Sequence, residues 1–342
     1  MSRHPILHRL LHRSCSSPHR PYTFHLGASW VAKAHDPYDK YIKIPFPQDS
    51  LIGSWRNKML VWPKVITTRD PGEDFLYIQP MREGSGISFG VADGVGSWTH
   101  SGVDPALFSQ ALMYHAHRYS RNAWPGEPET DPTLDYEERE QIAGWEMTPL
   151  ECLDLAYGGV LREKSVQAGS STALIINLNA HSGALRSASL GDSGYAIIRN
   201  SSVIYRQRPQ THFFNCPKQL TKLPANAGPK FAGACIDLPS DAEEYETTLR
   251  DGDIIVAYTD GFSDNVFPSE MVSICSLVSR AGGTEDDQVQ AMADRMVDFA
   301  QECMRSKRVS PFERAAAREG MYFRGGKVDD VTIIVGLVRE TT

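Results

Sequence analysis

Acidic residues stand at the ends of short apolar runs along this chain, and their placement constrains the fold more than any other feature. They are Glu73 and Asp74 before one run, Asp93, Asp192 and Asp260 each after another, and Asp329 and Asp330 before the last. A single Asp-Gly pair usually marks a turn, and the stretch 251–253 is interpreted as one. If the other runs are neighbouring strands of one sheet, their acids converge at one edge, as functional side chains on a rigid scaffold do.

Apolar runs rich in Val, Ile and aromatic residues, separated by Gly and Pro clusters, predict the strands. They cover residues 60–67, 75–78, 86–92, 171–178, 184–190, 195–199, 203–205, 253–259 and 330–338. Apolar residues at helical spacing predict helices over 105–120, 148–167, 269–280 and 286–305. Capping boxes begin at Thr148 and Ser310, with Glu151 and Glu313 as their acids. Strands followed by helices indicate one layered α+β domain over 60–340, after an irregular approach at 36–59.

Two stretches interrupt this pattern. Residues 121–147 hold eight acids and three prolines, which is typical of a solvated surface insertion. Residues 209–245 are punctuated by prolines and show no clear period. A segment of that length without regular structure suggests a functional flap.

Converging carboxylates repel one another and require positive charge nearby. The strand-end set offers oxygen ligands without His or Cys, which suits a hard ion such as Mg²⁺ or Mn²⁺. Two such ions bridged by one carboxylate can lower the pKa of a shared water and stabilise both oxygens of an in-line phosphoryl displacement. The acids therefore predict a two-metal centre that acts on phosphate.

The motifs that carry these acids resemble a known family. FGVADGVGSW (89–98), GSSTALI (169–175), ASLGDSGY (188–195), AYTDGFSDNV (257–266) and RGGKVDDVTII (324–334) are similar, in this order, to motifs of the metal-dependent protein serine/threonine phosphatases of type 2C. GEDF (72–75), THFFNCPKQL (211–220) and SPFERAA (310–316) resemble its mitochondrial, Ptc-seven-like branch. The resemblance covers residues 60–338 and implies a sandwich of two antiparallel β-sheets flanked by helices.

The resemblance implies a set of metal ligands. Asp93 would bridge two Mg²⁺ or Mn²⁺ ions, with the carbonyl of Gly94 as an additional ligand of one. Asp260 and Asp329 would complete the shell of the other ion. Asp192, together with Asp260, would hold a third and weaker ion.

Three further acids receive roles in the same way. Glu73 would sit at the second metal, mostly through water. Asp74 would orient the attacking water toward phosphorus. Asp330 stands where relatives often have Asn, so a supporting role is expected.

Two positions concern the substrate's phosphate and leaving group. Val95 follows the Asp93-Gly94 pair where many relatives have a proton-donating His, so a water on a metal is the expected acid. Arg69, four residues before Glu73, has the spacing of a phosphate-binding Arg in relatives. A turn with a surface ion pair is an equal interpretation of Arg69.

The N-terminal segment differs from the rest of the chain in charge. Residues 1–35 contain five Lys or Arg and no acid, so they contribute +5 to the formal net charge of −7. The remainder of the chain carries −12. Arg, Ser and an amphipathic pattern without acids are typical of a mitochondrial transit peptide, which is the hypothesis for 1–35. A disordered basic terminus is the alternative. Phosphorylated proteins of the mitochondrial matrix are then the expected partners, and the resemblance alone suggests ubiquinone synthesis among their processes.

Several classes of site are excluded. Six scattered cysteines without a CxxC pair predict buried, reduced thiols, and neither a zinc site nor a disulfide scaffold. The sequence contains no apolar stretch of eighteen residues, so no transmembrane segment is predicted. A net negative chain without a basic stripe is not expected to bind nucleic acid.

The leading hypothesis is a Mg²⁺- or Mn²⁺-dependent hydrolase, a protein serine/threonine phosphatase without a covalent enzyme intermediate. The alternative is a phosphatase-like regulatory domain that binds without turnover. Degenerate domains of that kind usually lose metal carboxylates, whereas this chain keeps all of them.

Overall fold

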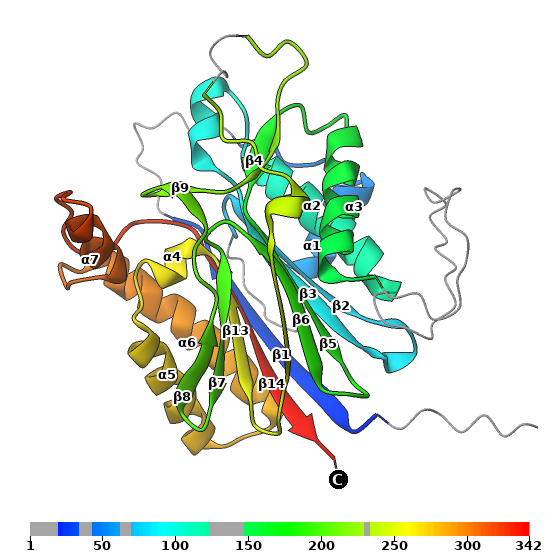
Figure 1. Cartoon of the computed structure of the whole chain (residues 1–342), viewed down its shortest axis with the longest axis vertical. Coiled ribbons are helices and arrows are strands. Elements are labelled where there is room, and N and C mark those ends of the chain that lie inside the picture. Colours follow the sequence, from blue (N-terminus) through cyan, green and yellow to red (C-terminus); the bar gives the residue numbers. More distant parts are fainter. Residues whose placement is uncertain (1–19, 34–42, 62–69, 123–146, 229–232, 342) are drawn as a thin grey trace, which may run out of the picture.

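Two five-stranded antiparallel β-sheets face each other, with helices covering both outer faces (Figure 1). The computed structural model describes residues 20–33, 43–61, 70–122, 147–228 and 233–341 of the 342. The first sheet has the order β1-β14-β13-β7-β8 and the second the order β12-β6-β5-β3-β2. The sandwich implied by the sequence motifs is therefore confirmed.

The strands of the two sheets come from distant parts of the chain. The first sheet contains β1 (Tyr22–Val31), β7 (Gly194–Arg199), β8 (Ser202–Arg206), β13 (Ile254–Tyr258) and β14 (Val331–Glu340). The second contains β2 (Asp74–Pro80), β3 (Gly86–Asp93), β5 (Ala173–Asn179), β6 (Ala184–Leu190) and β12 (Glu243–Thr248). Two small pairings lie outside the sheets, β4 (Gly169–Ser171) with β11 (Leu220–Lys222) and β9 (Thr211–Phe213) with β10 (Cys216–Pro217).

The helices form the two outer layers. Over the second sheet lie α1 (Leu51–Met59), α2 (Ala106–Tyr119) and α3 (Pro149–Arg162). Over the first lie α4 (Asp260–Ser263), α5 (Pro268–Ala281) and α6 (Glu285–Arg305), followed by α7 (Pro311–Arg318). Thr148 and Glu151 form the predicted capping box of α3, which ends at Arg162 and not at 167.

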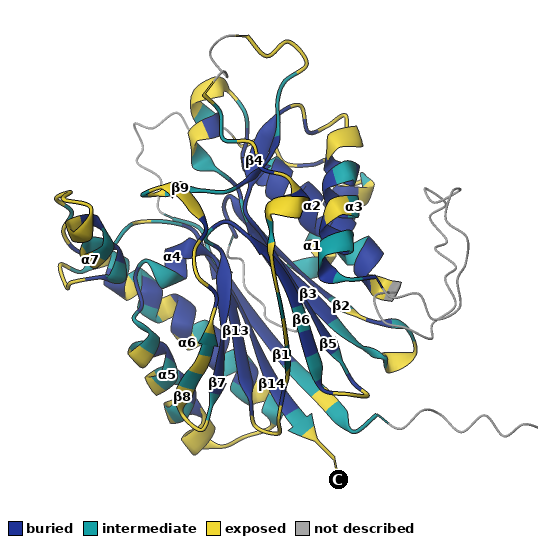
Figure 2. Cartoon of the chain, in the orientation of Figure 1, coloured by how far each residue is buried: buried dark blue, intermediate teal, exposed yellow. Residues whose placement is uncertain are grey.

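Alternation along the central strands explains the layers. In β13, Val256 and Tyr258 pack beneath α5 and α6, whereas Ile255 and Ala257 point into the space between the sheets. Both faces of the strand are buried (Figure 2), so its sequence is a continuous apolar run and not an alternating one. Burial on both faces fixes the register, because a slip of one residue would exchange the two faces.

The N-terminal boundary predicted from sequence is wrong. Regular structure begins at β1, which pairs with β14 from Tyr22 opposite Glu340 to Val31 opposite Val331. Trp30 of β1 is 1 % exposed between the sheets, so β1 is part of the folded domain. The basic composition of the surrounding residues concealed this strand.

Two other predictions near the N-terminus are affected. Residues 51–59 form α1 and not an irregular approach, and Leu60, expected to start a strand, caps that helix. Residues 62–69 and 123–146, which include most of the predicted strand and of the acidic insertion, lie outside the described residues. Among the helices that the structure describes, none combines the length and apolar character needed to cross a membrane.

Candidate active site

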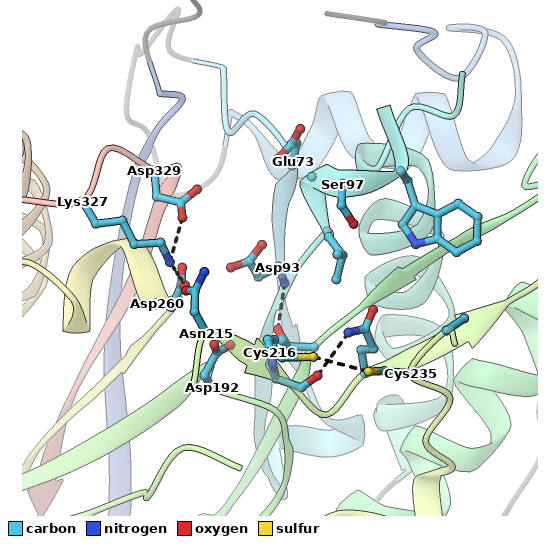
Figure 3. Close-up of a pocket in the computed structure, with 18 of the residues that line it drawn as sticks. Glu73, Asp93, Ser97, Asp192, Asn215, Cys216, Cys235, Asp260, Lys327 and Asp329 are labelled. Carbon is cyan, nitrogen blue, oxygen red and sulfur yellow. Dashed lines mark hydrogen bonds and ion pairs between the residues drawn. The ribbon is translucent and has the colours of Figure 1, made fainter. Parts of the chain in front are cut away.

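The predicted acids do converge, at one end of both sheets. Asp74 starts β2, Asp93 ends β3 and Asp192 lies in the turn between β6 and β7. Asp260 follows β13, and Asp329 precedes β14. The antiparallel order brings these strand ends together around a pocket of about 640 Å³ (Figure 3). Its charged lining residues are Lys33, Glu73, Asp93, Asp192, Asp260, Lys327 and Asp329.

Backbone contacts hold Asp93 at the centre of the pocket. Its N–H donates a hydrogen bond to Thr172 Oγ1 at 3.1 Å, and that hydroxyl oxygen lies 2.8 Å from Ser193 Oγ. The next residue, Gly94, donates its N–H to the Glu73 carbonyl. A Cβ at Gly94 would lie 2.7 Å from that carbonyl oxygen, so only glycine allows the two segments to approach this closely. The Asp-Gly pair is thus a packing requirement of the site.

Two lysines place ammonium groups among the carboxylates. Lys327 Nζ lies 2.5 Å from Asp260, 2.9 Å from Asp264 and 3.2 Å from Asp329. Lys33 Nζ, from the segment after β1, lies 2.6 Å from Glu73 and 3.3 Å from Asp329. Although burial opposes both ammonium groups, the surrounding carboxylates raise the pKa of each lysine, so both stay charged.

Sequence patterns predicted neither lysine. Lys327 lies inside the quoted RGGKVDD motif, which was the available signal for it. Lys33 falls within the basic segment 1–35, and only the apolar run of β1 before it indicates that it belongs to the domain.

Asp74 and Asp330 lie behind the pocket wall and hold its backbone. Asp330 accepts the N–H of Lys33 at 2.7 Å and that of Glu73 at 2.9 Å. Asp74 is fully buried and accepts the Thr259 hydroxyl at 2.7 Å on one oxygen, while its other oxygen, Oδ1, has no partner. The supporting role expected for Asp330 matches its two backbone contacts.

The carboxylates perturb one another strongly. Burial, and then the charges of Asp74 and Asp260, raise the pKa of Asp93 well above its usual range. Burial likewise raises the pKa of Asp192, with Asp260 and Asp264 adding to it. Burial also opposes ionisation of Asp260, but the Lys327 ammonium outweighs it and lowers the pKa of that acid. The positive charges of the two lysines therefore do not offset the negative charge of all the carboxylates.

The donor set fits hard divalent cations. Asp260 Oδ1, like Asp74 Oδ1, is buried without a hydrogen-bond partner, and unsatisfied carboxylate oxygens of this kind are suitable ligands for Mg²⁺ or Mn²⁺. Within the part of the chain that the structure describes, no three His, Cys, Asp or Glu side chains are arranged to hold an ion as they stand. The ammonium groups of Lys33 and Lys327 lie among these carboxylates.

The two positions expected to concern phosphate and leaving group differ in outcome. Val95 lines the pocket, and the lining residues that the structure describes include no histidine that could replace it. Arg69 lies outside the described residues.

Part of the predicted flap forms the far wall of the pocket. Phe213, Cys216 and Gln219 line it from one side of this segment, and Ala234 and Cys235 from the other. A chain of hydrogen bonds ties this wall to the segment that follows Asp93, because Trp98 Nε1 donates to Ser170 Oγ at 2.7 Å and Ser170 donates to Gln219 Oε1 at 2.5 Å.

Comparison with known proteins yields close relatives. The chain is 34% identical over 269 residues to "Protein phosphatase PTC7 homolog fig" of Drosophila willistoni, covering 78% of this chain and 77% of that protein. It is 33% identical over 273 residues to "Protein phosphatase PTC7 homolog" of Homo sapiens, covering 79% and 81%. The X-ray structure of the photosystem II phosphatase PBCP matches with a TM-score of 0.61 and 25% identity, over 92% of this chain and 98% of that one. No family model matches the chain.

Proposed function

Because the chain belongs to the type 2C family of protein serine/threonine phosphatases, among the PTC7 homologues, we propose that the acidic pocket is its catalytic centre and binds divalent cations. The enzyme hydrolyses phosphoserine and phosphothreonine esters of proteins. The observation that carries the assignment of the site is the convergence, at one end of the two sheets, of six carboxylates from five separate segments: Glu73, Asp74, Asp93, Asp192, Asp260 and Asp329. A binding domain without turnover would have no need to keep such a costly set of buried charges.

Five acids and one carbonyl are proposed to hold the ions. Asp93 projects into the middle of the pocket, with Asp260 and Asp329 facing it (Figure 3). Glu73 and the carbonyl of Gly94 stand on the β2 side. Asp192 is close enough to Asp260 for the charge of Asp260, after burial, to raise the pKa of Asp192. We assign Asp192 to a third, weaker metal site. Bound ions would lower the pKa of a water and offset the charge of the phosphoryl oxygens.

The chain's own residues orient the reactants. Asp74 Oδ1 is the unpartnered oxygen behind Asp93, and we propose that it accepts a hydrogen bond from the attacking water. Thr259 fixes the other oxygen of Asp74, so the carboxylate cannot rotate away. Asp330 holds the backbone of Glu73 and Lys33 and thereby sets the width of the pocket.

The lysines contribute charge and do not act as acids. Because the pKa of each is raised, neither ammonium releases a proton readily to a leaving alkoxide. A fixed positive charge is instead suited to an anionic phosphate, and we propose Lys33 as a phosphate-side cation, while Arg69 stays a prediction. With Val95 in place of a histidine, the leaving oxygen takes its proton from water.

The test is Asp93→Asn, assayed for turnover of a phosphothreonine peptide with Mn²⁺ and after EDTA treatment. Loss of the central ligand should lower turnover by about a hundredfold or more, since the interaction contributes several kcal/mol to the transition state. Asp154→Asn, an exposed acid on the outer helix α3, is the matched control and should leave turnover unchanged. Turnover that survives either EDTA or Asp93→Asn would contradict the assignment.

The location of the enzyme is a separate proposal. Residues 1–19 contain Arg3, Arg9 and Arg13 and no acid, which is typical of a mitochondrial transit peptide shorter than the one first expected. We infer a matrix enzyme that acts on mitochondrial phosphoproteins, with proteins of ubiquinone synthesis as candidates. Residues 1–19 fused to a fluorescent reporter should direct it to mitochondria, and a diffuse cytosolic signal would contradict this.

A further inference from the structure

Two cysteines face each other in the wall of the active-site pocket. The Sγ atoms of Cys216, in β10, and Cys235 lie 3.3 Å apart, and both residues line the pocket (Figure 3). Both are half-buried, unlike Cys152, Cys275 and Cys303, which are buried in the helical layers. The expectation that the thiols are all buried is therefore wrong for this pair.

The backbone on both sides of the pair is held in place. Asp237, two residues after Cys235, accepts the N–H of Gln219 and donates its own N–H to the Gln219 carbonyl. The carbonyl of Cys235 itself accepts the hydroxyl of Thr221 at 2.9 Å. These contacts join the strand that follows Cys216 to the segment that contains Cys235. The two thiols consequently remain neighbours without depending on the conformation of either side chain.

The sulfur separation suits bond formation. A disulfide has an S–S distance of about 2.05 Å, so the sulfurs would have to approach by roughly 1.2 Å. Rotation of the two side chains can supply a movement of that size, and the backbone anchors need not break.

We propose that Cys216 and Cys235 are a redox modification site, oxidised by hydrogen peroxide to a reversible disulfide that narrows access of phosphoprotein substrates to the pocket. The sulfur of Cys235 attacks one peroxide oxygen, the O–O bond breaks, and a sulfenic acid and one water result. The sulfur of Cys216 then displaces the hydroxyl of that sulfenic acid, which leaves as a second water with the proton of Cys216. Two electrons pass from the sulfurs to the peroxide.

The order of attack follows from the surroundings of Cys216. Burial, and then the neighbouring sulfur of Cys235, raise the pKa of the Cys216 thiol to about 11. A protonated thiol is a poor nucleophile toward peroxide, so Cys216 acts second, as the resolving thiol.

Oxidation of the two cysteines can influence substrate binding because the pocket wall that holds them contacts the segment before Asp192. The Lys218 carbonyl packs against Gly191, where an added Cβ would be 2.6 Å from it, and Gly191 precedes Asp192. Exposed Phe213, which pairs with Cys216 across the β9–β10 turn, forms the rim of the same wall. This consequence rests on the proposed function of the pocket, whereas formation of the disulfide does not.

The test treats the full chain with hydrogen peroxide and maps its cysteines by mass spectrometry without reduction. A peptide pair linking Cys216 to Cys235 and lighter by two hydrogens is expected, with the free thiols falling from six to four and returning after dithiothreitol. In Cys216→Ser, dimedone should label Cys235 as a sulfenic acid, and Cys275→Ser is the matched control that keeps the cross-link. Absence of the linked pair from the peroxide-treated wild-type chain, or a link of Cys235 to a cysteine other than Cys216 there, would overturn the proposal.

Kinetics test the regulatory part. The disulfide form should raise KM for a phosphothreonine peptide by about threefold or more and leave turnover of the small ester p-nitrophenyl phosphate unchanged. Cys216→Ser should keep its KM after peroxide. An unchanged KM in the fully cross-linked enzyme would overturn the effect on access. If neither redox form hydrolysed any phosphate ester, the proposed function would fail while the modification site would stand.

Discussion

Lys327 Nζ lies 2.5 Å from Asp260 Oδ2, so the chain's own ammonium group occupies the acidic cluster proposed to hold metal. The same ammonium contacts Asp264 and Asp329, and Lys327 is only 17% exposed at its side chain. A divalent cation that uses Asp260 or Asp329 must therefore displace or outcompete this lysine. Competition between an internal cation and the metal is a property that the family's motifs alone would not suggest.

Replacing Lys327 by Met should make the metal-free protein less stable and its metal binding tighter. Loss of the charge-assisted bonds should lower the free energy of unfolding without metal by about 2 kcal/mol. Because the competing ammonium is gone, the Kd for Mn²⁺ in isothermal titration calorimetry should fall by about tenfold, which corresponds to about 1.4 kcal/mol.

The matched control is Arg199→Met, which removes the partner of buried Asp253 far from the pocket. Arg199 binds Asp253 through two hydrogen bonds of 2.7 and 2.6 Å, so its loss should also destabilise the protein. Mn²⁺ should restore stability to Lys327→Met and not to Arg199→Met. Weaker Mn²⁺ binding by Lys327→Met would contradict the competition between lysine and metal.

Truncations should locate the start of the domain. A chain that begins at residue 20 retains β1 and should unfold cooperatively, as the full chain does. A chain that begins at residue 36 lacks the ten-residue pairing with β14 and the buried Trp30. Because total stability is only about 5–15 kcal/mol, that loss should abolish the cooperative thermal transition. Circular dichroism melting of both proteins is the measurement, and a cooperative transition in the shorter one would contradict the role of β1.

Substitutions of Asp330 should separate its two backbone contacts. Asp330→Asn keeps a single acceptor oxygen and should lose the bond to Lys33 or the one to Glu73, at a cost of about 1 kcal/mol in urea unfolding. Asp330→Ala loses both and should cost about 2 kcal/mol or more, because two buried N–H groups remain unsatisfied. Asp251→Ala, an acid at the opposite end of the sheet, serves as control. Equal stability of the Asn and Ala variants would show that Asp330 does not hold these segments.

His117 should make the protein sensitive to acid. Burial, and then the charge of Arg121, lower the pKa of His117 to about 4. Between about pH 6.5 and 4 the unfolded chain binds a proton at this position that the native protein does not, so stability falls as the pH falls. The difference between wild type and His117→Gln should change by up to about 1.4 kcal/mol per pH unit in this window. Urea unfolding at several pH values measures it, and a difference independent of pH would contradict this effect.

Local patterns predicted most of the elements correctly. The run before Thr259 is apolar on both faces, and Thr148 with Glu151 marks the start of α3 through a capping box. These signals depend on residues close in sequence, so they predict the elements correctly even when the fold is unknown. Only the first two residues of the strand expected at 60–67 are described, and Leu60 there caps α1 and packs against the buried cluster under that helix instead of starting a strand.

Sequence alone determined the identity of the carboxylates, since acids at the ends of apolar strands are visible in the order of residues, and the motifs around them indicated the family. Only the tertiary structure decided which groups face those acids. Lys33 meets Glu73 and Asp329 because β1 pairs with β14, and Cys216 meets Cys235 because Asp237 joins two segments of the flap. Such contacts arise from packing between residues distant in sequence, and no local period of polar and apolar residues encodes them.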